Sequence, residues 1–278
     1  KEITLLIISH KSARNVKRII DKINPNYKIL IVENSFDKSI KEILSPLKYN
    51  IDIILSDNNG YGSAINLGRK KIDTEYFFLF NPDVNNINDQ VIEEIYSVAK
   101  KLKNNFCCIG PRFINLKKNI KQSDHKKDLA ELSISGAAMF FNSSNFDKLR
   151  GFDENFFLYF EEKDFCKRGK KINLNSYQLN TAKVEHYVGT SVEYTNNKEK
   201  EEYNNLYNWH FMWSKCYFMK KHYGYLLTII YFFPLVIKYF LYLSIFQLIK
   251  NKKKFSKYKD RISAIFAVMT GKKAYRRI

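Results

Sequence analysis

Four short apolar runs decide the fold: ITLLIIS (residues 3–9), KILIVE (28–33), IDIILS (51–56) and YFFLFN (76–81). Each run is rich in β-branched or aromatic residues, and segments of helical period such as ARNVKRIIDKI (13–23) separate them. A continuously apolar strand is covered on both faces. The regular alternation of strands and helices therefore predicts an α/β fold, Rossmann-like, with a mostly parallel sheet and helices on both faces.

Polar side chains follow each of these four predicted strands. Right-handed crossovers place the carboxyl ends of parallel strands on one edge of the sheet, where such sheets bind ligands. Turns favour Asn, Asp, Ser and Gly for conformational reasons, so any one of them alone indicates only a turn. Four strands ending this way predict a site at that edge, formed by Ser9, His10, Lys11, Glu33, Asn34, Ser35, Asp37, Asp57, Asn58, Asn59, Gly60, Asn81, Pro82 and Asp83.

The segment NNGYGSAINLG (58–68) contains a GxG arrangement that resembles part of a dinucleotide-binding fingerprint. Ile65 stands where the third glycine belongs, and the segment follows the third strand instead of the first, so we reject a role in NAD binding. We interpret the segment as a tight turn into a helix whose first-turn amides can face an anion.

Two later runs, CCIGPRF (107–113) and SGAAMFF (135–141), predict further strands. A helix is predicted to begin near Glu161, and a polar stretch over residues 173–185 then leads to His186. A lone histidine is more often a surface or core residue than a metal ligand. Spacing alone therefore assigns no role to His186.

The stretch FDENFFLYFEEKDFCKR (152–168) places three carboxylates directly after large aromatic residues. Glu161, Glu162 and Asp164 repel one another and lose hydration beside the aromatic rings, so their clustering costs stability unless a cation or a reaction uses them. This pattern is typical of a general base. An acidic first helical turn, which the helix dipole stabilises, gives the same pattern.

Length and cysteine content bound the class of protein. The 278 residues, 45% of them hydrophobic, suffice for one large domain or one domain with an appendage. The N-terminal apolar run is too short for a signal peptide. The cysteines form neither a CxxC pair nor a disulfide framework, and we interpret them as buried thiols of a reducing compartment: Cys107, Cys108, Cys166 and Cys216.

The positive charge is concentrated at the end of the chain. The net charge is +19, but from Lys215 onward there are 15 Lys or Arg against one acid, Asp260, which leaves +5 for the first 214 residues. A body of modest charge with a strongly basic tail predicts an anionic partner, either nucleic acid or anionic lipid.

An almost entirely apolar run, YLLTIIYFFPLVIKYFLYLSIFQLI (225–249), lies within this basic region. It exceeds the roughly 20 residues that a membrane-spanning helix needs, but Pro234 and the charged Lys238 argue against a simple span. We interpret it as a kinked, shallowly inserted helix pair whose flanking lysines meet anionic headgroups. A true span and a buried core helix are the alternatives. Residues 255–278 predict one more basic amphipathic helix.

Three segments occur in a specific order: Asn81-Pro82-Asp83, GFDENFFLYFEEKDFCKRG (151–169) and HYVGTS (186–191). In these segments the chain resembles the glycosyltransferase family 2 enzymes with a GT-A fold, most closely the bacterial rhamnosyltransferase-like branch that builds surface polysaccharides. The resemblance covers roughly residues 3–225. It implies transfer of a sugar, with inversion, from a nucleotide diphosphate donor to an acceptor hydroxyl.

With this resemblance the chain is expected to contain a GT-A catalytic domain over residues 1–200. Residues 201–278 are expected to form an aromatic and basic helical region that associates with a membrane.

The resemblance also implies a divalent cation, Mg2+ or Mn2+, because the leaving diphosphate accumulates negative charge and hard cations prefer oxygen ligands. Asp83 fills the last position of the family's DxD-type motif, Asn81 stands at its first position, and His186 is the candidate second metal ligand.

For catalysis the resemblance implies a base that deprotonates the acceptor hydroxyl. The family's usual Glu-Asp-x-Asp signature corresponds here to Glu161, Glu162, Lys163 and Asp164, which makes Glu162 the expected base and Asp164 the next candidate. Arg168, one turn later, is expected to position the acceptor or diphosphate. Gly136 and Ala137 are expected to leave room for the sugar and acceptor.

The expected donor contacts come from the loops that follow the first four strands. The resemblance adds the glutamate-initiated loop after the second strand, where the family reads base and ribose. The predicted donor-binding residues are Ser9, His10, Glu33, Asn34, Asp57, Asn59, Gly60, Asn66, Asn81 and Asp83.

The implied partners are a dTDP- or UDP-sugar, with dTDP-rhamnose first, and a glycan or polyprenyl-diphosphate-linked acceptor. The expected location is peripheral, on the anionic cytoplasmic face of the bacterial inner membrane, and no nucleic acid partner is expected. Two alternatives remain at the level of sequence. One is a basic nucleic-acid-binding protein, and the other is a membrane-binding scaffold with an inactive transferase-like domain.

Overall fold

The computed structural model describes residues 2–115 and 128–277. The chain forms two compact units. The first unit comprises Lys1–Glu154 and Glu161–Glu193, and the second comprises Asn155–Phe160 and Tyr194–Ile278. The division predicted after residue 200 gave no indication that the short segment 155–160 would join the second unit.

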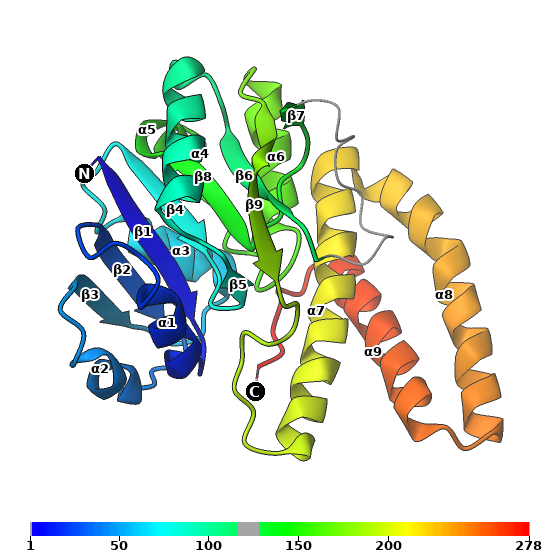
Figure 1. The fold of residues 1–278 in the computed structure, drawn as a ribbon. Coiled ribbons are helices and arrows are strands. Elements are labelled where there is room, and N and C mark those ends of the chain that lie inside the picture. The colour runs from blue at the N-terminus through cyan, green and yellow to red at the C-terminus, as the bar shows by residue number, and fades with distance from the viewer. Residues whose placement is uncertain (1, 116–127, 278) are drawn as a thin grey trace. The chain divides into compact units, whose positions relative to one another are not determined.

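The first unit is built on a mixed β-sheet (Figure 1). In the described part of the chain the strand order is β3-β2-β1-β4-β8-β6-β9-β5, with β7 also paired to β9. The strands are β1 (Ile3–Ser9), β2 (Lys28–Glu33), β3 (Asn50–Leu55), β4 (Tyr76–Phe80), β5 (Val84–Asn85), β6 (Cys108–Phe113), β7 (Leu129–Glu131), β8 (Ala138–Asn142) and β9 (Ser176–His186).

The first four strands are mutually parallel, as the alternating pattern predicts. The second half of the sheet departs from the mostly parallel expectation. β8 is antiparallel to both β4 and β6, and β9 is antiparallel to β5 and β7. The reversal of β8 brings its start to the edge where β1–β4 end. β9 is parallel to β6, which itself runs in the direction of β4, so the end of β9 lies at the same edge.

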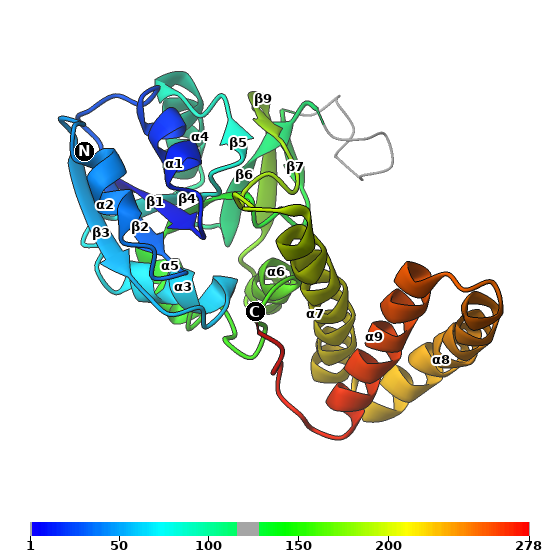
Figure 2. The ribbon, with the colours of Figure 1, turned by 90° about the horizontal axis from the view of Figure 1, so that it is seen from below.

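Helices cover both faces of the sheet, as Figure 2 shows. On β1, Leu5 and Ile7 pack on one face and Leu6 and Ile8 on the other, so a continuously apolar strand is buried on both sides. One face carries α1 (Ala13–Ile20), α2 (Ser39–Leu44) and α4 (Asp89–Lys101), and the other carries α3 (Tyr61–Arg69), α5 (Ser143–Lys148) and α6 (Glu161–Lys171).

The four cysteines are buried and unpaired, as expected of reduced thiols. The sulfurs of Cys108 and Cys166 lie 3.7 Å apart, well beyond the length of a disulfide bond. They form part of the packing between β6 and α6.

The prediction missed β9, which it interpreted as a polar stretch over residues 173–185. The strand contains Gln178 and Asn180, both buried, and their side chains hydrogen-bond to each other at 2.7 Å (Gln178 Nε2 to Asn180 Oδ1). Because a buried polar pair replaces the apolar residues that mark a strand, the sequence pattern hides β9.

The second unit consists of α7 (Asn197–Tyr223), α8 (Tyr225–Leu248) and α9 (Lys252–Met269), which pack against one another. The tail after α9 folds back within this unit: Arg276 pairs with Asp260 at 2.7 Å, and the Arg276 carbonyl lies 2.9 Å from Nε2 of His210. Segment 155–160 is fixed to α7, because the Ser214 hydroxyl donates to the Leu158 carbonyl at 2.8 Å.

The kinked helix pair expected over residues 225–249 is wrong, because α8 is one helix with Pro234 inside it. A proline removes one hydrogen bond, and the intact turns on either side keep the helix continuous. The predicted basic helix in the tail is present as α9, which begins at Lys252.

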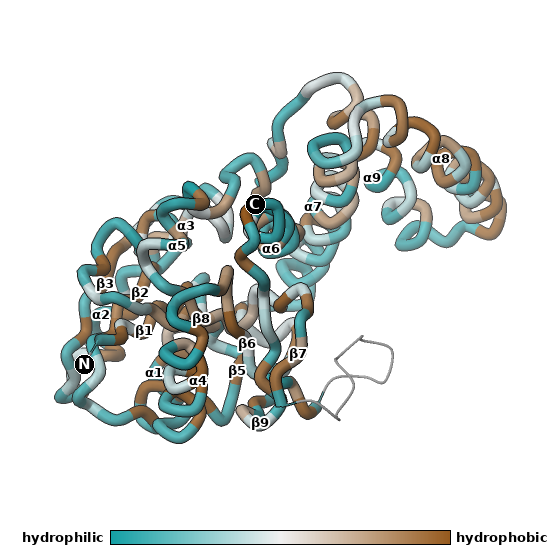
Figure 3. The backbone as a smooth tube through the Cα atoms, turned by 90° about the horizontal axis from the view of Figure 1, so that it is seen from above, coloured by the Kyte–Doolittle hydropathy of each residue, from teal (hydrophilic) through white to brown (hydrophobic). Residues whose placement is uncertain are grey.

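α8 is an apolar helix, and much of its trace is brown in Figure 3. Only Thr228, Phe232 and Tyr239 are buried, whereas Leu226, Ile230 and other large apolar side chains are more than half exposed. Among the described residues α8 is the one helix long and apolar enough to cross a membrane, and 17% of its most apolar window is buried. Length and composition alone are weak evidence of a span.

Candidate active site

Glu33 joins the loops that follow β1 and β2. Its buried carboxylate accepts a hydrogen bond from the Ser9 hydroxyl at 2.5 Å and from the Ser35 amide at 2.9 Å, and the Ser35 hydroxyl also donates to it. Both carboxylate oxygens are used in this way. Ser9 and Glu33 are therefore fixed to each other at the edge where the donor contacts are expected.

The neighbouring residues at this edge also lie together. Nδ1 of His10 is 2.9 Å from the Asn34 carbonyl, and the Asn34 amide donates to Asn58 Oδ1 at 3.3 Å. The other side-chain atom of Asn34, Oδ1, is buried without a hydrogen-bond partner among the described residues. A buried acceptor of this kind points to a ligand donor, because an unsatisfied oxygen costs roughly 1–3 kcal/mol.

The loop after β3 contributes exposed polar groups to the same edge. Asp57 and Asn59 are exposed, and the Asn59 amide donates to the Asp57 carbonyl at 2.8 Å. Gly60 precedes α3 with φ of 108°, a conformation that disfavours any residue with a Cβ. The glycine is thus required for the turn from β3 into α3.

The reversal of β8 brings Gly136 and Ala137 to this edge as well. Phe80 at the end of β4 is opposite Ala138 at the start of β8, and the Asn81 amide donates to the Ala137 carbonyl at 2.9 Å. Residues that precede an antiparallel strand meet the carboxyl end of its neighbour. Gly136 and Ala137 consequently lie beside the Asn81-Pro82-Asp83 turn.

Tyr61, at the first position of α3, connects these elements, and sequence reasoning did not select it. Its hydroxyl lies 2.7 Å from both Asn81 Oδ1 and the Gly136 carbonyl oxygen. Burial raises the pKa of Tyr61 well above its usual value, and the negative charges of Glu161, Asp83 and Glu162 raise it further. Tyr61 therefore lies within electrostatic range of all three carboxylates.

Glu161 and Glu162 occupy the first turn of α6. A Cβ on Gly136 would lie 3.6 Å from the Glu162 Cβ, and one on Gly62 would lie 3.7 Å from the Glu161 Cβ. The two glutamates thus border Gly136 and the start of α3, which already contacts the Asn81 turn through Tyr61. The carboxylates predicted for catalysis and for the metal share one neighbourhood.

Both glutamates are shifted toward their neutral forms. Loss of hydration raises the pKa of Glu162 to about 7, while the backbone amides of the helix turn oppose the shift. Loss of hydration also raises the pKa of Glu161, and repulsion from Glu162 adds to it. Oε2 of Glu161 is buried and has no hydrogen-bond partner among the described residues. A carboxylate with a pKa near neutrality is suited to proton transfer.

Asp83 and His186 come together through the β5–β9 pair. Val84 is opposite His186, and the Tyr187 amide donates to the Asp83 carbonyl at 2.9 Å. As a result, His186 Nε2 lies 3.4 Å from Asp83 Oδ1. That oxygen is buried without a hydrogen-bond partner among the described residues.

This pair fits a divalent cation as two of its ligands. An orphaned carboxylate oxygen beside an imidazole nitrogen is the kind of donor set that a cation satisfies. No group of three or more His, Cys, Asp or Glu able to hold a metal occurs in the part of the chain described by the structure.

The structure corrects the expected roles of Asp164 and Arg168. Asp164 is fully buried and its Oδ2 accepts from Arg168 Nε at 2.8 Å. The same guanidinium donates to the carbonyls of Leu149 and Gly151, the latter at 2.7 Å. Because Arg168 is occupied by the protein's own backbone, this ion pair holds residues 149–151 against α6 and does not present either group to an acceptor.

Asn66 is also corrected from donor contact to structural support. Its side-chain amide donates to the Phe152 carbonyl and to Glu154 Oε1, both at 2.9 Å, and its Oδ1 accepts from the Phe152 amide at 2.9 Å. These bonds use the polar atoms of the side chain. Asn66 therefore fixes the segment that leads toward α6.

The mixed sheet, with these polar and acidic residues at one edge, has the architecture of a GT-A-like transferase. The family profile described as Glycosyl transferase family 2 matches residues 5–177, more than half of the chain. The chain belongs to this family, and it is a glycosyltransferase.

Two relatives show the kinds of transfer found near this sequence. The low-salt glycan biosynthesis hexosyltransferase Agl10 of Haloferax volcanii is 24% identical over 217 residues, covering 66% of this chain and 67% of Agl10. The rhamnosyltransferase WbbL of Escherichia coli is 22% identical over 255 residues, covering 78% of this chain and 92% of WbbL.

Solved structures share the fold at low identity. S. aureus TarS 1-349 in complex with UDP superposes with a TM-score of 0.54 at 12% identity, covering 99% of this chain and 93% of TarS 1-349. The mannosyltransferase PcManGT of Pyrobaculum calidifontis, with GDP-Man and Mn2+, gives a TM-score of 0.59 at 9% identity, covering 97% and 87%. These likenesses confirm the predicted GT-A architecture.

Proposed function

We propose that this glycosyltransferase inverts the configuration at the anomeric carbon of the sugar that it transfers. We also propose that Glu162 is the base that activates the acceptor hydroxyl. The observation that carries the proposal is Tyr61. Its hydroxyl contacts Asn81, two residues before Asp83, and the Gly136 carbonyl. A Cβ on Gly136 would lie 3.7 Å from the Tyr61 ring and 3.6 Å from the Glu162 Cβ. This arrangement supports a donor-side acid, Asp83, and a base, Glu162, that act on the same sugar in a single displacement.

Glu162 suits the role of base better than its neighbours do. It is half-buried, whereas Glu161 is 4% exposed and Asp164 is fully buried in its pair with Arg168. Its carboxylate would remove the proton as the acceptor oxygen attacks the anomeric carbon and the bond to the nucleotide diphosphate breaks. A base with a pKa near neutrality can then release the proton to solvent.

Asp83 and His186 are the residues that would hold a divalent cation. When bound, Mg2+ or Mn2+ would neutralise charge that develops on the leaving diphosphate. PcManGT and GalNAc-T7, which share the fold, are described with Mn2+. Asn34 Oδ1, which has no hydrogen-bond partner among the described residues, is an additional acceptor for the nucleotide at the same edge.

The first candidate donor is dTDP-rhamnose, because WbbL is a rhamnosyltransferase and its alignment spans most of both chains. UDP-hexoses and UDP-N-acetylhexosamine follow, since Agl10 is a hexosyltransferase and TarS has been solved with UDP-GlcNAc. We propose a role in surface polysaccharide synthesis on the same basis.

The acceptor is proposed to be a glycan linked to a polyprenyl diphosphate. α8 supports this assignment, because its apolar residues are exposed and lysines flank it at both ends, including Lys221 and Lys252. An apolar helix with basic flanks is suited to the interface of an anionic membrane. We therefore propose peripheral attachment at the cytoplasmic face of a bacterial inner membrane.

A thermal-shift screen of nucleotide diphosphates with and without Mn2+ tests the donor side. A ligand that binds only the folded state raises the melting temperature, and at equal concentration a tighter ligand raises it more. We expect dTDP or UDP to raise it, more so with Mn2+, and the matching nucleotide sugar to yield labelled lipid-linked product in membranes. An absence of any nucleotide effect together with tight oligonucleotide binding would instead favour the nucleic-acid-binding alternative.

A further inference from the structure

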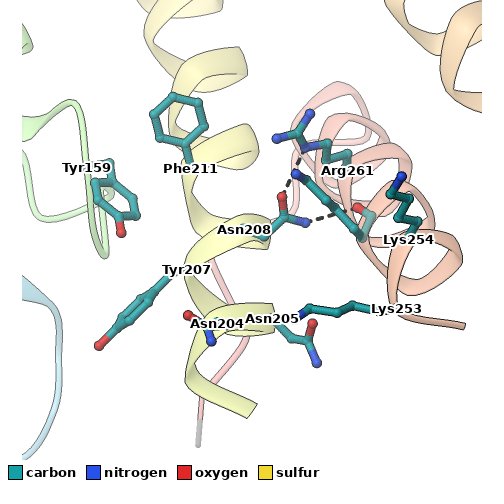
Figure 4. A pocket seen from close by; sticks show the side chains of 10 residues that line it. Tyr159, Asn204, Asn205, Tyr207, Asn208, Phe211, Lys253, Lys254 and Arg261 are labelled. Carbon is teal, nitrogen blue, oxygen red and sulfur yellow. Dashed lines mark hydrogen bonds between the residues drawn. The ribbon is translucent and has the colours of Figure 1, made fainter. Parts of the chain in front are cut away.

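The second unit contains a basic and aromatic pocket, which we call the α7–α9 pocket. It has a volume of about 630 Å3, and it lies wholly within the second unit. Figure 4 shows α7 between aromatic side chains on one side and basic side chains of α9 on the other. The lining residues are Tyr159, Asn204, Asn205, Tyr207, Asn208, Phe211, Lys253, Lys254, Lys257 and Arg261.

The pocket concentrates positive charge. Among its described lining residues four are basic and none is acidic. Burial lowers the pKa of Lys257, and the nearby charges of Arg261 and Lys254 lower it further. The acid of α9, Asp260, is committed elsewhere, because it pairs with Arg276 at 2.7 Å. A bound anion would therefore reduce the mutual repulsion of the basic side chains that line the pocket.

The basic side of the pocket is also positioned by the protein. Asn208 accepts from Arg261 Nε at 3.0 Å and donates to the Lys257 carbonyl at 3.0 Å. Arg261 stacks near Tyr239 of α8, with 5.7 Å between the guanidinium carbon and the ring centre. A guanidinium held in this way is a preorganised partner for phosphate oxygens.

The aromatic side offers a surface for a sugar ring. Tyr159 packs edge-on against Phe211 at 5.6 Å and against Tyr207 at 6.4 Å. Tyr159 and the residue after it, Phe160, both have φ of 70°, a costly conformation for non-glycine residues that the surrounding packing must maintain.

We propose that the α7–α9 pocket binds the diphosphate of the lipid-linked acceptor, with the first sugar beside Tyr159. This inference rests on the proposed function and identifies where its acceptor is held. A diphosphate matches a cluster of cations better than a single headgroup charge does, because it carries more charge in one place. The bare apolar surface of α8, in the same unit, favours a lipid over a nucleic acid.

Vesicle flotation of the full chain tests the proposal without requiring activity. Three vesicle types would carry equal total charge from polyprenyl diphosphate, polyprenyl monophosphate or phosphatidylglycerol. The test variant is K253Q/K254Q/K257Q, and K198Q/K200Q/K272Q removes the same charge from exposed positions outside the pocket. The single variant K257Q serves if the triple variant fails to keep the wild-type melting temperature.

We expect the wild type and the control variant to bind diphosphate vesicles about tenfold more tightly than the other two types. The pocket variant should bind all three alike. Equal binding of all vesicles by the wild type, a preference retained by the pocket variant, or displacement by a single-stranded oligonucleotide would each overturn the proposal.

Transfer assays separate failure of the pocket from failure of the proposed function. If the wild type and pocket variant transfer sugar to the diphosphate-linked acceptor at equal rates, the pocket assignment is wrong and the function stands. If neither protein transfers to any acceptor while the wild type alone prefers diphosphate vesicles, the pocket stands and the function is wrong.

Discussion

The hydroxyl oxygen of Tyr61 lies 2.7 Å from Oδ1 of Asn81 and also 2.7 Å from the carbonyl oxygen of Gly136. A hydroxyl has one proton to donate, so it serves one of these acceptors at a time unless the Asn81 amide turns its NH2 group toward Tyr61. With that orientation one phenol satisfies two loops. It fixes the positions of the turn after β4, the start of β8 and the start of α3 relative to one another.

Replacing Tyr61 by phenylalanine should therefore loosen the site while keeping its shape. The change removes the hydroxyl that contacts the half-buried Gly136 carbonyl, at a cost of about 1 kcal/mol in the free energy of unfolding. We expect transfer to slow by about tenfold, since misplaced groups lose rate steeply. Denaturant unfolding and initial rates measure both effects. Tyr96→Phe, whose hydroxyl bonds to Glu2 at the surface, is the control.

Glu162→Gln should abolish transfer and keep donor binding. Removing a general base typically lowers the rate by about 10²–10⁴-fold. The nucleotide-induced shift in melting temperature should match that of the wild type. Glu161→Gln is the matched variant next to it, and a larger loss of rate in that variant than in Glu162→Gln would transfer the role of base to Glu161.

The pKa of Glu162 predicts opposite trends in activity and stability with pH. The pKa is about 7 in the folded protein against an ordinary value of 4.5, so the folded state binds more protons between these values. The contribution of Glu162 to the free energy of unfolding is fully present below about pH 4.5 and is lost as the pH rises through 7. Activity, which needs the ionised carboxylate, should instead rise through the same range.

Melting curves of Glu162→Gln check this assignment. At about pH 8 the variant should be more stable than the wild type by on the order of 1–3 kcal/mol, because it has no charge to bury. At about pH 4 the difference should vanish. A variant that is equally stable at both values would show that Glu162 ionises freely in the folded protein.

Asp83→Asn should remove the effect of Mn2+ on nucleotide binding. The amide keeps the shape of the side chain and loses the charge that holds a cation. His186→Gln should weaken the effect by a smaller amount, because it keeps the carboxylate. Thermal shifts with nucleotide diphosphate and increasing Mn2+ measure the affinity, with the exposed Asp73→Asn as control. A Mn2+ response unchanged in Asp83→Asn would place the cation elsewhere.

Asp164→Ala should destabilise the protein strongly, because it leaves the Arg168 guanidinium without its buried partner. Breaking such a pair costs about 3–5 kcal/mol. Transfer per folded molecule should remain close to that of the wild type for Asp164→Asn, which keeps a hydrogen-bond acceptor. Loss of transfer in Asp164→Asn at unchanged stability would instead restore Asp164 as the base.

The alternating pattern predicted the first half of the sheet and the loops at its edge, because periodicity and topology decide both. It could not bring His186 to Asp83. That contact depends on β9, whose buried Gln178 and Asn180 look like a loop in sequence. Asp164 and Arg168 matched a motif, but only the folded structure shows that backbone carbonyls of the protein itself bind the Arg168 guanidinium.

Tyr61 was missed for a related reason. Its importance comes from two long-range contacts, to Asn81 and to Gly136, and no local pattern encodes them. The one feature of the sequence that could have indicated Tyr61 is its position as a large residue between Gly60 and Gly62, at the turn into α3. The segment 155–160 was likewise read as part of the acidic motif, whereas it packs on α7 of the second unit.

The uncovered side of α8 has a practical consequence for handling the protein. In detergent-free buffer two such apolar surfaces can bury each other, which lowers the free energy. Purified molecules should therefore self-associate. The particle size measured by light scattering would then depend on the amount of added surfactant more than on protein concentration. Assemblies seen without surfactant would then result from contacts between exposed α8 surfaces, and they would not reveal the native quaternary state.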